Sequence, residues 1–177
     1  MGTALERRVS ADQKRRKKLR QNIMVGRMAM LMILAVSLLN QLLLLLKVEY
    51  HFLFSASMPY YLNWLARELG GQGGVTAFKV LAVLLTVLIF AAYVACWLLS
   101  GQRREWLLAA LGLYSADTLV LIIFSFALLE NPASCLLEVL THLVCLWLLY
   151  TAFQSARRLS RMPKRRRSTP ETNAQEE

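Results

Sequence analysis

Four long apolar segments dominate this sequence and leave few folds open to it. They run from about residue 28 to 46, 78 to 99, 106 to 129 and 133 to 153. A helix needs about 20 apolar residues to cross the hydrocarbon of a bilayer, whereas the mean helix of a soluble protein has about 11 residues. The segments fit the first length, and 56% of the 177 residues are hydrophobic. The sequence therefore predicts an all-α integral membrane protein, a four-helix bundle, rather than a soluble domain.

Basic residues lie almost entirely outside these segments and on one side of the predicted topology. Of the 21 Lys and Arg residues, 9 precede Met28, 7 follow Phe153 and 2 form the Arg103-Arg104 turn between the second and third segments. With four spans these three regions share one side of the membrane, and the positive-inside rule places that side in the cytoplasm. We therefore expect both termini to be cytoplasmic.

The two ends of the chain are polar and cannot bury a core. We expect residues 1–22 to be mobile or helical only near the membrane, residues 23–156 to form the membrane domain, and residues 157–177 to be a disordered tail, first basic and then acidic. The basic runs favour anionic lipid headgroups, at about 1 kcal/mol per nearby Lys or Arg. They lack the aromatic platform or folded module typical of nucleic-acid binding, so we expect no nucleic-acid partner. The residues expected to contact lipid are Lys14, Arg15, Arg16, Lys17, Lys18, Lys164, Arg165, Arg166 and Arg167.

Residues 48–75 form the longest connection and are rich in aromatic side chains, as expected at a headgroup boundary. Within it, residues 59–69 are predicted to form a short helix, with Ser57 as its N-cap and Gly70 just after its end. Its apolar residues share one face, which favours a helix lying in the membrane interface. The alternative is that residues 52–65 enter the membrane as a re-entrant segment.

Two ionisable side chains lie deep in predicted spans, where each costs about 2.5–3.5 kcal/mol on insertion scales. Asp117 is near the middle of the third span and His142 near the middle of the fourth. At about 1.5 Å per residue, both are roughly 15–18 Å from either end of their helices. The short connection makes these helices antiparallel neighbours, so we expect the two side chains to meet. Glu138, one turn before His142, would extend this polar line outward, and Tyr150 would continue it inward.

Several functions are compatible with this line of polar groups. The first is a polar pair that holds two helices in register. Interhelical polar contacts contribute about 1 kcal/mol or less in membranes, which is enough to fix a helix partner. The second is a proton or ion path in a small transporter or conducting subunit, and a metal site on Asp117, Glu138 and His142 is a third. An intramembrane hydrolase would pair His142 with Ser115 or Ser125, but the sequence contains no GxSxG or HExxH motif. We expect an accessory or structural component rather than an enzyme, with no metal and no cofactor.

The remaining polar and thiol groups in the spans favour contacts rather than chemistry. Asn40 and Gln41 could hydrogen-bond to another helix of this chain, of a homo-oligomer or of another membrane protein. Cys96, Cys135 and Cys145 show no CxxC or Cys/His spacing, so they predict neither a disulfide framework nor a zinc site.

The stretch FLFSASMPYY at residues 52–61 resembles a pattern in an uncharacterised group of small bacterial four-span membrane proteins. In that group an FSA-x-x-P segment follows the first span, an Asp-Thr-Leu lies in the third, and a histidine followed by Leu-Tyr lies in the fourth. The resemblance covers about residues 20–155. It implies a bacterial cytoplasmic membrane and brings no known activity or cofactor. The residues that carry it here are Phe54, Ser55 and Pro59, Asp117-Thr118-Leu119, and His142 with Leu149-Tyr150.

Overall fold

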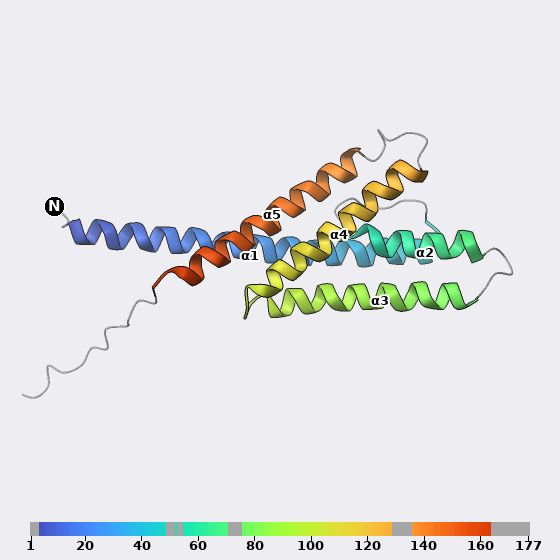
Figure 1. Ribbon diagram of the computed structural model, residues 1–177, viewed down its shortest axis with the longest axis horizontal. Coiled ribbons are helices and arrows are strands. Elements are labelled where there is room, and N and C mark those ends of the chain that lie inside the picture. Colours follow the sequence, from blue (N-terminus) through green and yellow to red (C-terminus); the bar gives the residue numbers. More distant parts are fainter. Residues whose placement is uncertain (1–3, 49–51, 53–54, 71–75, 129–135, 164–177) are drawn as a thin grey trace, which may run out of the picture.

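The computed structural model describes residues 4–48, 52, 55–70, 76–128 and 136–163, and within these residues its regular secondary structure is all helical (Figure 1). Four of its helices, all except α2, are long and apolar enough to cross a membrane. The prediction of an all-α chain with four candidate spans is confirmed. The helices are α1 (Ala4–Leu45), α2 (Ser57–Gly70), α3 (Thr76–Leu99), α4 (Glu105–Leu128) and α5 (Leu136–Arg161).

Helices α1, α2 and α3 run along the long axis of the molecule, and α4 and α5 cross them obliquely (Figure 1). The contact between α1 and α5 is the most extensive, α4 packs on both α3 and α5, and α2 packs chiefly on α3. Large side chains from three of the helices meet in the core, where Met30, Ile33, Leu107, Tyr114 and Leu149 are almost fully buried.

Along the apolar segments, the outward faces of the helices are apolar. Side chains such as Met32 on α1, Leu84 and Leu88 on α3, Ile123 on α4 and Trp147 on α5 are more than half exposed. Apolar surface this extensive is untenable in water and is what hydrocarbon would cover. Exposure and helix length therefore agree on a multipass membrane protein.

Helix α1 is longer than the first apolar segment and includes the basic run. It is continuous for 42 residues, about 60 Å at ~1.5 Å per residue. No proline or glycine lies between Ala4 and Gly26, and Lys, Arg, Gln and Leu all favour a helix. The expectation that residues 1–22 are mobile or helical only near the membrane is therefore wrong from Ala4 onward.

Helix α5 also extends past its apolar segment and accompanies α1 at the basic end. It continues to Arg161 rather than ending near residue 153, so the predicted disordered tail from residue 157 begins too early. The Asn22 amide donates to Ser155 Oγ at 3.2 Å, and the Arg16 guanidinium donates to the Pro163 carbonyl at 2.7 Å. Together the two helices project beyond the others at this end (Figure 1).

At Gly26, α1 approaches α5 closely. A Cβ atom built on Gly26 would lie 2.3 Å from the Cβ of Ala152, which is a clash with a side chain that cannot move away. Small residues at such a crossing allow two membrane helices to pack backbone to backbone.

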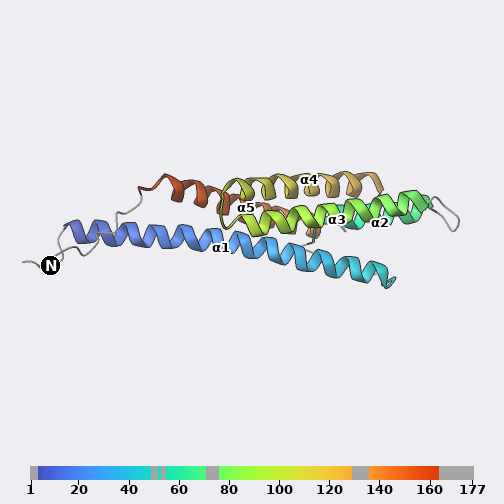
Figure 2. The same cartoon turned by 90° about the horizontal axis from the view of Figure 1, so that it is seen from below.

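Helix α2 runs antiparallel to α3, beside it, rather than across the end of the spans (Figures 1 and 2). The Asn63 amide donates to Thr86 Oγ1 of α3 at 2.8 Å and to Gln41 Oε1 of α1 at 3.2 Å. Its first residue, Ser57, hydrogen-bonds to Asp117, halfway along α4. This packing among the other helices is what the re-entrant alternative predicts, whereas an interfacial helix would contact fewer of them; the depth of α2 in a membrane stays a prediction.

Candidate functional site

The start of α2 is held by a carboxylate from another helix. Asp117 on α4 accepts hydrogen bonds from the backbone amides of Ser57, at 2.9 Å to Oδ2, and of Met58, at 2.6 Å to Oδ1. The first amides of a helix have no partner within the helix and carry the positive end of its dipole. A negatively charged side chain placed there satisfies both needs, so Asp117 acts as the N-cap of α2 although it lies on α4.

The Ser57 hydroxyl joins this cap to α5. Its Oγ lies 3.2 Å from Glu138 Oε1, to which it can donate, and 3.2 Å from His142 Nε2. His142 Nε2 is also 3.4 Å from Asp117 Oδ2. All four side chains are at most 6% exposed. We call Ser57, Asp117, Glu138 and His142 the central polar cluster.

The imidazole of His142 is fixed in orientation from two sides. Its Nδ1 lies 3.0 Å from the backbone carbonyl of Glu138, and because a carbonyl only accepts, Nδ1 must carry the proton of this hydrogen bond. The ring stacks on Tyr114, with 5.1 Å between centroids and 2° between planes. Nε2 is therefore aimed at Ser57 and Asp117.

Helix α1 holds the segment that leads into α2. The Asn40 side chain donates to the Phe52 carbonyl and to Ser55 Oγ, both at 2.8 Å, and accepts from the Phe52 amide at 2.7 Å. Ser37 Oγ accepts from the Ala56 amide at 2.6 Å. The partner of Asn40 is therefore a segment of this same chain, the residues that lead into α2.

The structure brings Asp117, Glu138 and His142 together, and it adds Ser57 as the group that touches all three. Tyr150 is not part of this line, because it is 49% exposed and its hydroxyl accepts from Gln154 at 2.8 Å. Eight residues after His142, it has rotated off the inward face.

The outer-loop motif is only partly described. Ser55 and Pro59 are buried, the first against Asn40 and the second in the first turn of α2, whereas Phe54 lies outside the described residues. Proline suits this turn because its missing amide hydrogen would have had no helical partner. The motif therefore supplies the entry into α2.

The hydroxyls of the serines proposed for a hydrolase are engaged within α4 rather than with His142. Ser115 and Ser125 donate to carbonyls of their own helix, at 2.8 Å to Leu111 and 2.7 Å to Leu121. Ser57 is the hydroxyl beside the imidazole, but its surroundings differ from those of a serine nucleophile. In a catalytic triad the acid binds Nδ1 and free amides receive the oxyanion, whereas here Asp117 is on the Nε2 side and binds the amides itself.

None of four cavities between described residues is lined by the central polar cluster. The cavities found between described residues are lined by other side chains, at the basic end and beside Gln41 and Arg67. Within the described ranges, no group of three or more His, Cys, Asp or Glu side chains is arranged to hold a metal ion.

The predicted lipid-contact residues fall into two groups. Lys14, Arg15, Lys17 and Lys18 are exposed on α1, and Arg16 is partly buried there. Lys164, Arg165, Arg166 and Arg167 lie outside the described part of the chain.

No protein-family model, curated protein or solved structure matches this chain. The geometry of the central polar cluster is therefore the basis for a functional proposal.

Proposed function

We propose that this protein is a structural or accessory component of a membrane, in which the central polar cluster holds α2 as a re-entrant half-helix between the spans. The observation that carries the proposal is that both oxygens of Asp117 are used on the first two amides of α2. An unpaired buried amide costs about 1–3 kcal/mol, and hydrocarbon offers no water to replace a lost partner. A buried helix start of this kind needs such a cap.

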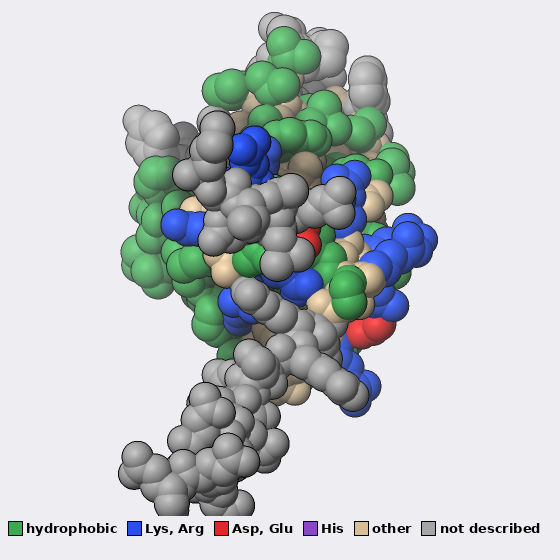
Figure 3. Space-filling view, turned by 90° about the vertical axis from the view of Figure 1, so that its left-hand side faces the viewer, with side chains coloured by type: hydrophobic (Ala, Val, Ile, Leu, Met, Phe, Trp, Pro, Cys, Tyr) green, Lys and Arg blue, Asp and Glu red, His purple; other side chains and the backbone are tan. Residues whose placement is uncertain are grey.

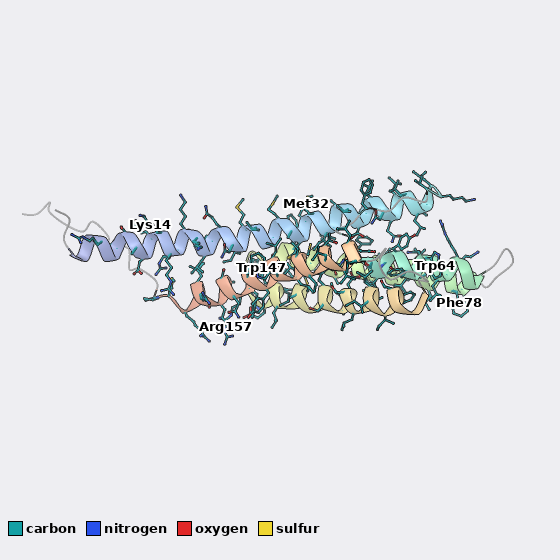
Figure 4. All side chains as sticks on the ribbon, turned by 90° about the horizontal axis from the view of Figure 1, so that it is seen from above. Lys14, Met32, Trp64, Phe78, Trp147 and Arg157 are labelled. Carbon is teal, nitrogen blue, oxygen red and sulfur yellow. The ribbon has the colours of Figure 1, made fainter. Side chains whose placement is uncertain are left out.

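The proposed setting is a bacterial cytoplasmic membrane, with both termini in the cytoplasm and the spans forming a four-helix bundle. Seen from the end where α1 and α5 project, Lys and Arg side chains gather around the exposed face (Figure 3). Lys14 and Arg157 lie toward this end, whereas Trp64 and Phe78 lie toward the other (Figure 4). The charge asymmetry supports the orientation, and the resemblance to small bacterial four-span proteins supports the membrane. The exposed lysines of α1 support contact with anionic headgroups.

The partners that suit this proposal are a second copy of the chain or another membrane protein. A half-helix seated among the spans would change the shape of the bundle at the end opposite the basic one, without adding a further transmembrane span. The apolar outward faces of α3 and α4 would lie against lipid or such a partner.

A proton- or ion-conducting subunit is the second candidate, favoured by the charge of the cluster. Two carboxylates, Asp117 and Glu138, surround one imidazole, so the cluster has one acidic group more than it has basic groups. Such intramembrane groups are typical of proton relays. The half-helix start, with its positive dipole, offsets part of this excess.

Flux measurements distinguish the two candidates. Purified protein is reconstituted in liposomes with a pH-sensitive dye inside, and proton and K⁺ flux are recorded for the wild type, Asp117→Asn and Glu138→Gln. We expect no flux above that of empty liposomes, together with lower stability of Asp117→Asn. Flux in the wild type that is lost in a stably folded Asp117→Asn protein would replace the structural proposal with the conducting one.

A further inference from the structure

A cavity of about 430 Å³ lies at the basic end, between the α3–α4 turn, α1 and α5. It is distinct from the central polar cluster, and its lining is cationic on one side and apolar on the other. We propose that this cavity binds the phosphate group of one anionic glycerophospholipid in the adjacent leaflet.

The cationic side is formed by two arginines of the α3–α4 turn, and a third arginine packs behind that turn. Arg103 and Arg104 line the cavity directly. The guanidinium of Arg27 on α1 packs against Gly101, since a Cβ added there would lie 3.2 Å from Arg27 Nη2. Arg27 Nε is buried and makes no hydrogen bond in the described part of the chain. Glu105 is the acidic residue among those that line the cavity, and its pairing with Arg104 is exposed, at 3.4 Å.

Arg104 is held across the cavity by a contact with α5. Its Nη1 donates to Ser160 Oγ at 2.7 Å, and Ser160 in turn donates to the Arg157 carbonyl at 2.9 Å. A guanidinium fixed in this way loses less conformational entropy when it binds an anion. Arginine also matches the oxygens of a phosphate with two parallel donors.

The apolar side favours a lipid over a soluble phosphate ester. Ile23, Leu107 and Leu159 contribute to the lining. Trp97 and Trp106 stand on either side of the turn, and tryptophan is enriched where spans meet the headgroups. The cavity would therefore lie at headgroup depth, with room for a phosphate against the arginines and for the start of an acyl chain against the apolar wall. Its volume is within the ~300–1,000 Å³ usual for small-molecule sites.

This site differs from the diffuse attraction expected of the basic ends. The run from Lys14 to Lys18 attracts any anionic surface, whereas a cavity in which Arg104 is held in place would select one headgroup and hold one molecule. The inference rests on the membrane placement for the source of the phosphate, and it is independent of the role proposed for the central polar cluster.

The test measures lipid binding to the full chain in detergent, with native mass spectrometry as the readout. The probes are short-chain phosphatidylglycerol and phosphatidylcholine with the same acyl chains, with glycerol 3-phosphate as a soluble competitor. The test variant is Arg103→Gln/Arg104→Gln. The matched control is Arg157→Gln/Arg158→Gln, which removes two exposed charges from the same end outside this cavity.

We expect the wild type to retain one phosphatidylglycerol in preference to phosphatidylcholine. The test variant should lose this preference about tenfold or more, because it loses charge-assisted bonds to the phosphate, and the control should stay within about twofold of the wild type. Gly101→Val, which keeps every charge but displaces Arg27, should also weaken binding. Equal losses in the test and control pairs, or no headgroup preference in the wild type, would overturn the proposal. Competition by glycerol 3-phosphate as strong as that by the lipid would overturn the assignment to a lipid.

Discussion

Replacing Asp117 tests whether α2 is held by its cap. Asp117→Ala leaves the amides of Ser57 and Met58 without their acceptor and removes one neighbour of His142. Losing a helix N-cap costs about 0.5–2 kcal/mol, and each buried amide left unpaired costs about 1–3 kcal/mol. Polar contacts measured in membranes average nearer 0.6 kcal/mol. We therefore expect Asp117→Ala to lower the free energy of unfolding by about 2–4 kcal/mol. Asp117→Asn keeps one acceptor oxygen and should lower it by about 1–2 kcal/mol.

The assay combines unfolding of the purified protein in detergent with hydrogen exchange of peptides that cover α2. In both variants the first turn of α2 should exchange faster, while exchange in α3 should change much less. Ser115→Ala is the matched control on the same helix, because its hydroxyl donates only to the Leu111 carbonyl one turn away. It should change stability by less than about 0.5 kcal/mol.

A double-mutant cycle with His142→Ala completes the test. If Asp117 and His142 act together, the loss in the double variant should be smaller than the sum of the two single losses. An Asp117→Ala protein that is as stable as the wild type, with unchanged exchange in α2, would refute the capping argument. The carboxylate would then be retained at a stability cost, and conduction would become the better explanation.

Three further substitutions have definite expected outcomes, measured by unfolding in detergent and, for Asn40→Ala, also by hydrogen exchange. Gly26→Ala should destabilise the protein by about 1–3 kcal/mol, because the new Cβ would meet Ala152 at 2.3 Å. Gly112→Ala is the matched control: a Cβ there would have nothing within 4 Å, so this change should be neutral or stabilising by up to about 1 kcal/mol. Equal effects of the two would contradict the close α1–α5 crossing. Asn40→Ala should cost about 1–3 kcal/mol and speed exchange at the entry to α2, because it removes both backbone contacts to Phe52. Unchanged exchange there would show that α1 does not hold this entry.

The lengths of the spans could be predicted from the sequence where an apolar segment and a helix coincide. Predicted spans 78–99 and 106–129 correspond to α3 (Thr76–Leu99) and α4 (Glu105–Leu128). The predicted spans and the observed helices differ in length at α1 and α5, because hydropathy marks where a membrane ends and not where a helix ends. Helix α5 continues through strong helix formers until the approach to Pro163, which disfavours helical geometry in the residue before it.

Part of the central polar cluster was also predictable. Counting residues from the helix ends placed Asp117 and His142 at one depth, and their contact distance is 3.4 Å. Ser57 was predicted as an N-cap, but its place in the cluster was missed because the amphipathic pattern of α2 suits a headgroup layer and a protein neighbour equally well. The signal that could have found it is the pair Ser37 and Asn40, two polar residues nearly one turn apart on the first span, which need partners from a segment entering the membrane.

The cap on α2 also sets an order for biogenesis. Ser57 and Asp117 are 60 positions apart in the chain, and Ser57 and His142 are 85 apart. When α1 and α2 leave the ribosome, neither partner has yet been synthesised, so the bare amides of α2 cannot enter hydrocarbon without a large penalty. In the proposed re-entrant arrangement, the half-helix would therefore wait at the membrane surface or in the insertion machinery until α4 and α5 are in place. Its seating would then be the last step of assembly, and we expect a chain truncated before α4 to leave it at the surface.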